Sequence, residues 1–262
     1  MFKKTIFAFG LLALLVSFFP SIHNHASAQE KLKPLDPNKY RINYSFPIHP
    51  GGKPFRFKIE LDKKSTVTGV SVFREGESTP FQTLQECKAN LPLELNENDE
   101  DLELLKHADL NFDGFEDLEL LQYYIPHLDK RLYCVYLWDN KTGRFDYAPE
   151  VTDDVGVSPV SHPENKTITS DDEWDFGAYE TTTYRWIGSK LELIEQNGLY
   201  GNADNPKCHF TYSCSRLVNG KMVTTMEKPL CSEKEIDNPP KCPTAATIPA
   251  PTVPQKTPKR KE

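Results

Sequence analysis

Short segments rich in β-branched and aromatic residues recur along the chain, and each ends at residues that favour turns. β-Branched and aromatic residues favour strands, whereas Gly, Asn, Asp and Ser favour the turns between them. The segments are RFKIEL, TGVSVFR, LYCVYLWD, GRFDYAPEV, TTTYRWI and KLELIEQ. Regular short strands of this kind indicate a sandwich, a barrel or a propeller. Because no repeat period recurs, we predict an all-β domain that is built from hairpins or is irregularly propeller-like.

The first 28 residues have the pattern of a secretory signal peptide. Lys3 and Lys4 form a basic start, an apolar run covers residues 6–19, and Ala26-Ser27-Ala28 supplies small residues for cleavage. The apolar run is shorter than a membrane span requires. We therefore predict cleavage near Ala28 and a mature protein that is periplasmic or secreted.

The end of the chain differs in composition from the β-prone part. Residues 237–262 are rich in proline and end in basic residues, which predicts a largely disordered tail. Residues 29–236 then form a single β domain. Loss of the two signal-peptide lysines takes the net charge from −7 to −9. An acidic surface disfavours nucleic acid and anionic membranes as partners, and it favours a basic protein or a cation.

One hairpin is predicted by its turn residues and also suggests a disulfide. Asn219-Gly220 is typical of a two-residue type I′ turn, and it separates CHFTYSCSRLV from KMVTTMEKPLC. Counting outward from this turn brings Cys208 opposite Cys231. Opposed residues of an antiparallel pair lie about 4.5–5.5 Å apart at Cα, within reach of a disulfide. We therefore predict the Cys208–Cys231 disulfide. The prediction requires that the pairing of the two strands keeps the same register from the turn to the cysteines.

All six cysteines follow the predicted signal peptide, and an even number in an exported chain favours disulfides over metal ligands. Six cysteines allow 15 pairings, and the sequence does not choose among them. A Cys208–Cys214 bond is disfavoured, because six extended residues span roughly 20 Å. The pairs expected beside Cys208–Cys231 are Cys87–Cys134 and Cys214–Cys242.

The segment DLNFDGFED matches a calcium-binding loop. Its candidate ligands are the side chains at loop positions 1, 3, 5 and 9 and the backbone carbonyl at position 7, with glycine at position 6 for the sharp turn. These residues are Asp109, Asn111, Asp113, Asp117 and Phe115. Hard oxygen donors at this spacing suit Ca²⁺ better than Mg²⁺, which keeps more water ligands. Because position 12 is a leucine, the loop departs from an EF-hand, and we predict an integrin-type calcium loop between strands.

Catalytic motifs are absent from the sequence. It contains no G-x-S-x-G, H-E-x-x-H or P-loop pattern, and the histidines after the signal peptide show no metal spacing. Adjacent acids such as Asp153-Asp154 and Asp171-Asp172 would face opposite ways on a strand. The sequence therefore predicts a protein that acts by binding rather than as an enzyme.

The segments DLNFDGFEDLELL, YLWDNKTGRFDY, KTITS, GAY, YRW and KLELI follow one another in an order that resembles a family of exported bacterial proteins. The family combines an integrin-like calcium loop with an irregular, propeller-like β fold. It includes xanthomonad immunity proteins that inhibit a lysozyme-like effector of a type IV secretion system. The resemblance covers about 90 residues, and the cysteine-containing C-terminal hairpin and the tail depart from it. It implies a calcium-dependent inhibitor of a lysozyme-like peptidoglycan hydrolase.

Such an inhibitor needs a protruding loop with aromatic and donor side chains, because lysozyme-type sites pair carboxylates in a cleft. We predict this loop at residues 170–185. Its candidate partner-binding residues are Trp174, Phe176, Tyr179, Tyr184 and Arg185, and Tyr179 is the preferred insertion residue. The alternative is a calcium-stabilised module of the cell envelope that binds glycan or protein without inhibiting an enzyme. Exposed aromatic residues in a shallow groove would favour that alternative.

Overall fold

A computed structural model describes residues 40–63, 66–87, 102–125, 128, 130–174, 177–203, 205 and 207–243. The predicted signal peptide, most of the predicted tail and Phe176 lie outside the described residues. Within these ranges, no helix is long and apolar enough to cross a membrane.

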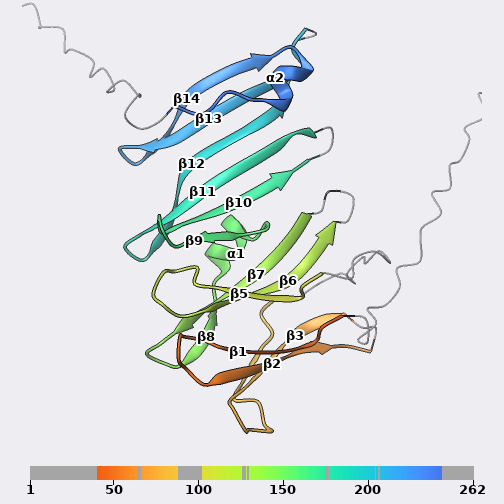
Figure 1. Cartoon of the computed structure of the whole chain (residues 1–262), viewed down its shortest axis with the longest axis vertical. Coiled ribbons are helices and arrows are strands. Elements are labelled where there is room, and N and C mark those ends of the chain that lie inside the picture. The colour runs from red at the N-terminus through yellow and green to blue at the C-terminus, as the bar shows by residue number, and fades with distance from the viewer. Residues whose placement is uncertain are drawn as a thin grey trace, which may run out of the picture. The chain divides into compact units, whose positions relative to one another are not determined.

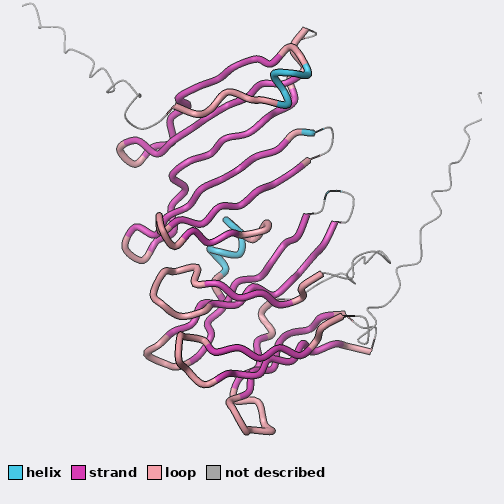
Figure 2. The backbone as a smooth tube through the Cα atoms, viewed as in Figure 1, coloured by secondary structure: helices cyan, strands magenta, loops and turns pink. Residues whose placement is uncertain are grey.

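Three antiparallel sheets make up the fold, which confirms the predicted all-β class (Figures 1 and 2). The first contains β1 (Asn43–Pro47), β2 (Pro54–Leu61), β3 (Val67–Phe73) and β4 (Gln82–Leu84). The second contains β5 (Leu105–Ala108), β6 (Asp117–Ile125), β7 (Lys130–Asp139) and β8 (Arg144–Tyr147). The third contains β9 (Val160–His162), β10 (Thr167–Glu173), β11 (Tyr179–Ile187), β12 (Lys190–Gly201), β13 (Phe210–Val218) and β14 (Lys221–Leu230). Strands that follow one another in the sequence are neighbours in each sheet, so the domain is built from hairpins, as predicted.

The first hydrophobic core joins the first two sheets. The rings of Phe46 and Phe57 stack with centroids 4.3 Å apart, and Phe57 meets Phe145 of β8 edge-on at 6.0 Å. The disulfide Cys87–Cys134 lies within the same cluster, where both cysteines are buried. Aromatic packing and a covalent link therefore hold these two sheets together.

A short helix contributes residues to the second core, which lies between the second and third sheets. Helix α1 (Pro149–Val155) begins with a proline, whose missing N–H costs no hydrogen bond at that position. It buries Val151 and Val155 in one cluster with Ile168 of β10 and Tyr184 of β11. The helix thus gives one end of the third sheet an apolar surface to pack against.

A β-bulge in β12 changes which face of that strand is apolar. Thr183 is opposite Glu195, whereas the next residue, Tyr184, is opposite Leu193, so Ile194 is an extra residue in β12. Side chains alternate between the two faces of a sheet, and an extra residue reverses the alternation. Odd-numbered residues of β12 before Ile194 therefore lie on one face of the sheet, and odd-numbered residues after Ile194 lie on the other face.

The third core lies on the other face of the third sheet. There Leu199, Tyr212 and Leu230 are buried, and Ile236 of helix α2 (Glu233–Asp237) packs against them. Residues 191 and 193 of β12 pack in the second core instead. The third sheet is consequently buried on opposite faces at its two ends.

All three disulfides that were expected from the sequence are present: Cys87–Cys134, Cys208–Cys231 and Cys214–Cys242. The positive φ angles of Asn219 (52°) and Gly220 (74°) match the predicted type I′ turn. Disulfides are typical of proteins in an oxidising compartment, which agrees with export from the cytoplasm.

The register of the last hairpin differs from the prediction beyond its middle. Pairing follows the expected count from the turn to residues 215 and 224, and then Cys214 lies opposite Met226. One extra residue, Thr225, shifts the remaining pairs by one. Cys208 and Cys231 lie just beyond the paired strands, with Cα atoms 4.0 Å apart, so their bond forms despite the shift.

Candidate functional site

The acidic loop between β5 and β6 folds back on itself through side-chain-to-backbone hydrogen bonds. Asp109 accepts the backbone N–H groups of Asp113 and Gly114 at 3.1 and 2.9 Å. Asn111 Oδ1 also accepts the Asp113 N–H at 3.0 Å, and Asp113 accepts the Phe115 N–H at 3.0 Å. Gly114 has a φ of 90°, which side-chain-bearing residues rarely adopt. These bonds fix the side chains at loop positions 1, 3 and 5.

Asp117 ends the loop and is fully buried, with 0% of its surface exposed. Its Oδ1 accepts the backbone N–H of Trp138 at 2.8 Å, and its Oδ2 accepts the N–H of Leu110 at 2.8 Å and of Asn111 at 3.3 Å. Asp117 therefore connects both ends of the loop to β7.

Burial also changes the acidity of this side chain. The pKa of Asp117 is raised to about 7, mainly because burial disfavours the charged form. The hydrogen bonds from Trp138 and Leu110 oppose this increase, and the carboxylates of Asp113 and Asp109 add to it.

The donor set of the loop has the chemistry that a hard cation requires. Each carboxylate oxygen has two lone pairs, so accepting one N–H leaves capacity for a further bond. Among the described residues, no salt bridge neutralises Asp109, Asp113 or Asp117. In the same part of the chain, no three His, Cys, Asp or Glu side chains converge as a metal-ligand group. An ion would therefore need the amide of Asn111 and the carbonyl of Phe115 as well.

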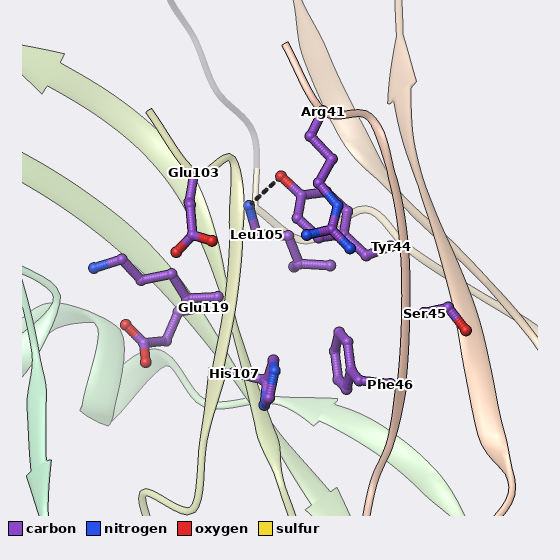
Figure 3. Close-up of a pocket in the computed structure, with 9 residues that line it drawn as sticks. Arg41, Tyr44, Ser45, Phe46, Glu103, Leu105, His107 and Glu119 are labelled. Atoms are coloured by element: carbon purple, nitrogen blue, oxygen red, sulfur yellow. Dashed lines mark hydrogen bonds between the residues drawn. The ribbon is translucent and has the colours of Figure 1, made fainter. Parts of the chain in front are cut away.

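A pocket of about 250 Å³ lies between β1 and β5, the strand that precedes the acidic loop (Figure 3). One wall is formed by Phe46 and His107, whose rings stack with centroids 3.9 Å apart. His107 Nδ1 lies 2.9 Å from Glu116 Oε2, so the ring is held from both sides. The hydroxyl of Tyr44 accepts the backbone N–H of Leu105 at 3.3 Å.

The floor of this pocket includes a buried acid. Glu119 is 3% exposed, and its pKa is raised to about 7 by burial, while the charge of Lys106 acts in the opposite direction. Glu119 lies opposite Lys106 in the β5–β6 pair. The sequence does not indicate this pocket, because its residues come from two sheets and form no motif.

The structure separates the residues that were predicted to bind a partner. The prediction of one loop over residues 170–185 is wrong: β10 continues to Glu173 and β11 begins at Tyr179. Tyr184 is only 9% exposed and packs in the second core, so it has little surface to offer. Tyr179 is half-buried against the third core.

Two of the remaining candidates are exposed. Trp174 directly follows β10 and is 38% exposed, and its backbone N–H donates to the carbonyl of Ala178 at 2.9 Å. Arg185 is also exposed, on the face of β11 opposite to Tyr184. Phe176 lies outside the described residues. The hairpin therefore presents Trp174 and Arg185 on different faces rather than as one aromatic cluster.

A shallow groove of about 450 Å³ crosses β12, β13 and β14. Its lining is polar and includes Gln196, Tyr200, Asn202 and Ser213. Sequence reasoning missed this groove, although the alternation of polar and buried residues along FTYSCS is a signal for a sheet with one polar face.

Comparisons with known proteins give little further information. No family model matches the chain, and no curated protein matches it. Among solved structures, the chain is similar to a Xanthomonas protein described as related to a type IV secretion system. The match covers 70% of this chain and 93% of that chain, at 17% identity and a TM-score of 0.46. This TM-score is too low to carry a fold or a function over to the chain.

Proposed function

We propose that this chain is an exported binding protein, not an enzyme, and that it binds and inhibits a lysozyme-like peptidoglycan hydrolase. The supporting observation is the acidic end of the β10–β11 hairpin. Asp171 and Glu173 of β10 are exposed there, and the exposed residue Trp174 follows them in the chain. Negative charge attracts a basic enzyme and speeds encounter, and an exposed tryptophan is typical of binding hot spots.

The hairpin suits the cleft of a hydrolase that binds sugars. Its aromatic ring would occupy a sugar subsite, and its carboxylates would pair with basic residues around the cleft. Asp172 at the same hairpin end forms a salt bridge with Lys130 of β7, which restrains β10 against the second sheet. Restraint of this kind lowers the entropy that is lost on binding.

Calcium has a structural role in this proposal. Asp109, Asn111, Asp113 and Asp117, with the carbonyl of Phe115, would hold the ion. A bound Ca²⁺ would offset the repulsion among the three carboxylates of the loop. Because Asp117 accepts a hydrogen bond from Trp138 of β7, the ion would stabilise the second sheet as well as the loop.

The proposal is tested by titrating the purified, oxidised mature protein, residues 29–262, into peptidoglycan hydrolysis by a panel of lysozyme-type enzymes. Stoichiometric inhibition of one class is expected. Trp174→Ala should weaken inhibition about ten-fold or more. Val223→Ala is the matched control, because Val223 is an exposed apolar residue on a different strand, β14. Absence of inhibition across the panel by a folded protein would contradict the proposal.

A further inference from the structure

One face of the third sheet is polar where the opposite face carries the third core. Opposed residues of an antiparallel pair lie on the same face. Glu180 is opposite Gly198, which is opposite Ser213, and Ser213 is opposite Glu227. Tyr200 lies opposite Thr211 on the same face. The groove across β12–β14 is formed by this row of small and polar residues.

A hydrogen-bonded network fixes the side chains at one edge of the groove. Glu180 Oε2 accepts the hydroxyl of Tyr200 at 2.7 Å and the amide of Gln196 at 2.6 Å. Gly198 lies between them in the sheet, and a Cβ there would be 3.1 Å from Cζ of Tyr200. A Cβ there would also lie 2.4 Å from the backbone oxygen of Tyr179, so the absence of a side chain at Gly198 leaves room both for β11 and for the Tyr200 ring that reaches Glu180. Both hydrogen bonds of the network are formed within the protein itself.

An aromatic platform continues this edge. The rings of Trp174 and Tyr200 have centroids 6.3 Å apart and are inclined by 36°. Trp174 is exposed, whereas Tyr200 is partly covered and lines the groove. An exposed indole beside polar side chains offers an apolar face for stacking and leaves hydrogen-bonding groups within reach.

The charges of the groove define the class of ligand. Its lining combines the amides of Gln196 and Asn202 with hydroxyls of Tyr200, Thr211 and Ser213, and it includes one carboxylate, Glu227. No Lys, Arg or His belongs to the lining among the described residues. Amides and hydroxyls both donate and accept hydrogen bonds, which matches the hydroxyl groups of a sugar. A carboxylate with no cation beside it disfavours an anionic ligand.

We propose that this groove is a binding site for a neutral oligosaccharide. One sugar ring stacks on Trp174, and the following rings lie along the groove, where Gln196, Asn202 and Ser213 bond their hydroxyl groups. The Tyr200–Glu180–Gln196 network holds the amide of Gln196 in a fixed orientation. The site extends over three strands, so it accepts a chain of sugars rather than a single one.

This inference goes beyond the proposed function and does not require it. It shares with that proposal the exposed ring of Trp174, but the groove residues Gln196 and Asn202 belong to the sugar site alone. A protein that inhibits no hydrolase can still bind the oligosaccharide. Conversely, an inhibitor could fail to bind free sugar, so the two proposals can fail separately.

The test is calorimetric titration of the oxidised mature protein with three hexamers. The neutral probe is β-1,4-linked N-acetylglucosamine hexamer, the cationic probe is its deacetylated form, and the anionic probe is a galacturonic acid hexamer. We expect the neutral hexamer to bind, with Trp174→Ala and Gln196→Ala each weakening binding about ten-fold. Val223→Ala lies outside the groove and should bind as the unmodified protein does.

Three outcomes would overturn the inference. The first is absence of binding of the neutral hexamer by the folded protein at millimolar concentration. The second is binding that neither variant weakens. The third is binding of the cationic hexamer alone, which would show that carboxylates capture a cation and that the groove does not recognise sugar. Gln196→Ala keeps the test valid if Trp174→Ala does not fold.

Discussion

The carboxylate of Asp117 accepts the backbone N–H of Trp138 at 2.8 Å, and this bond ties the end of the acidic loop to β7. The Trp138 ring packs on Phe145 at a centroid distance of 5.0 Å within the first core. Trp138 therefore contacts the acidic loop through its backbone and the first core through its ring.

The contribution of Asp117 can be measured by replacing it. Asp117→Ala leaves the N–H groups of Trp138 and Leu110 without their acceptor in a buried environment. We expect a loss of about 3 kcal/mol in the free energy of unfolding, measured in denaturant. Asp153→Ala, on the exposed side of α1, should change it by less than about 0.5 kcal/mol. Equal effects of the two changes would rule out this role.

Removal of calcium should lower the melting temperature. A ligand present at about 100 times its Kd stabilises a protein by about 2.7 kcal/mol, which corresponds to about 5–10 °C in a domain of this size. Chelator should abolish this gain, and Ca²⁺ should restore it more effectively than Mg²⁺. Asp109→Ala should make the melting temperature insensitive to chelator. A chelator that leaves the unmodified protein unchanged would refute the calcium assignment.

Gly69 of β3 is expected to tolerate no side chain. A Cβ at Gly69 would lie 2.1 Å from the carbonyl oxygen of Leu84, on the paired strand β4. Because both groups belong to the backbone, one strand must move, and Gly69→Ala should cost about 3 kcal/mol or more. Gly201→Ala is the control, since its Cβ would meet no atom within 4 Å. Similar denaturation midpoints for both variants would contradict this reading of β3.

Stability should decrease at alkaline pH because of Tyr136. Burial raises the pKa of Tyr136 to about 12, and its hydroxyl accepts the N–H of Cys87 at 2.9 Å. The folded state keeps this proton more tightly than the unfolded state, in which tyrosine ionises near pH 10. The contribution is therefore complete below pH 10 and is lost between pH 10 and 12, by about 2–3 kcal/mol.

Denaturant unfolding between pH 9 and 12 measures this loss. Tyr136→Phe has no ionisable group at the position, so its stability should fall less over the same interval. If the free energy of unfolding falls equally in both proteins, the loss of stability comes from other tyrosines.

Features set by local chemistry could be predicted from the sequence. The Asn219-Gly220 turn determined the last hairpin, and the cysteines at the ends of that hairpin determined their own pairing. The spacing of acids around Gly114 predicted a calcium loop between strands; the loop lies between β5 and β6, and calcium binding there stays a prediction. In each case the interacting residues are close in the sequence or joined by one turn.

Features that depend on distant packing could not be predicted in this way. Tyr184 belongs to an aromatic-rich segment like Trp174, but α1 covers Tyr184 and leaves Trp174 exposed. The helix itself comes from the segment PEVTDDV, although its first three residues end the segment GRFDYAPEV, for which the sequence predicts a strand. The sequence does not show which face of a strand a remote helix will cover.

The extra residue Ile194 lets the leucines of β12, all at odd positions, contribute to two cores. Leu191 and Leu193 pack in the second core, and Leu199 is buried in the third core on the other side of the sheet. If the same sequence formed a strand without the bulge, the three leucines would lie on one face, and one core would lose its leucine from β12. If Ile194 were deleted, residue 195 would follow residue 193 in regular alternation, and each leucine would keep its present face. The pairing of β12 with β13 begins at residue 195 and would not be affected. Ile194 thus marks a position at which related sequences could differ by one residue in length and still build the same two cores.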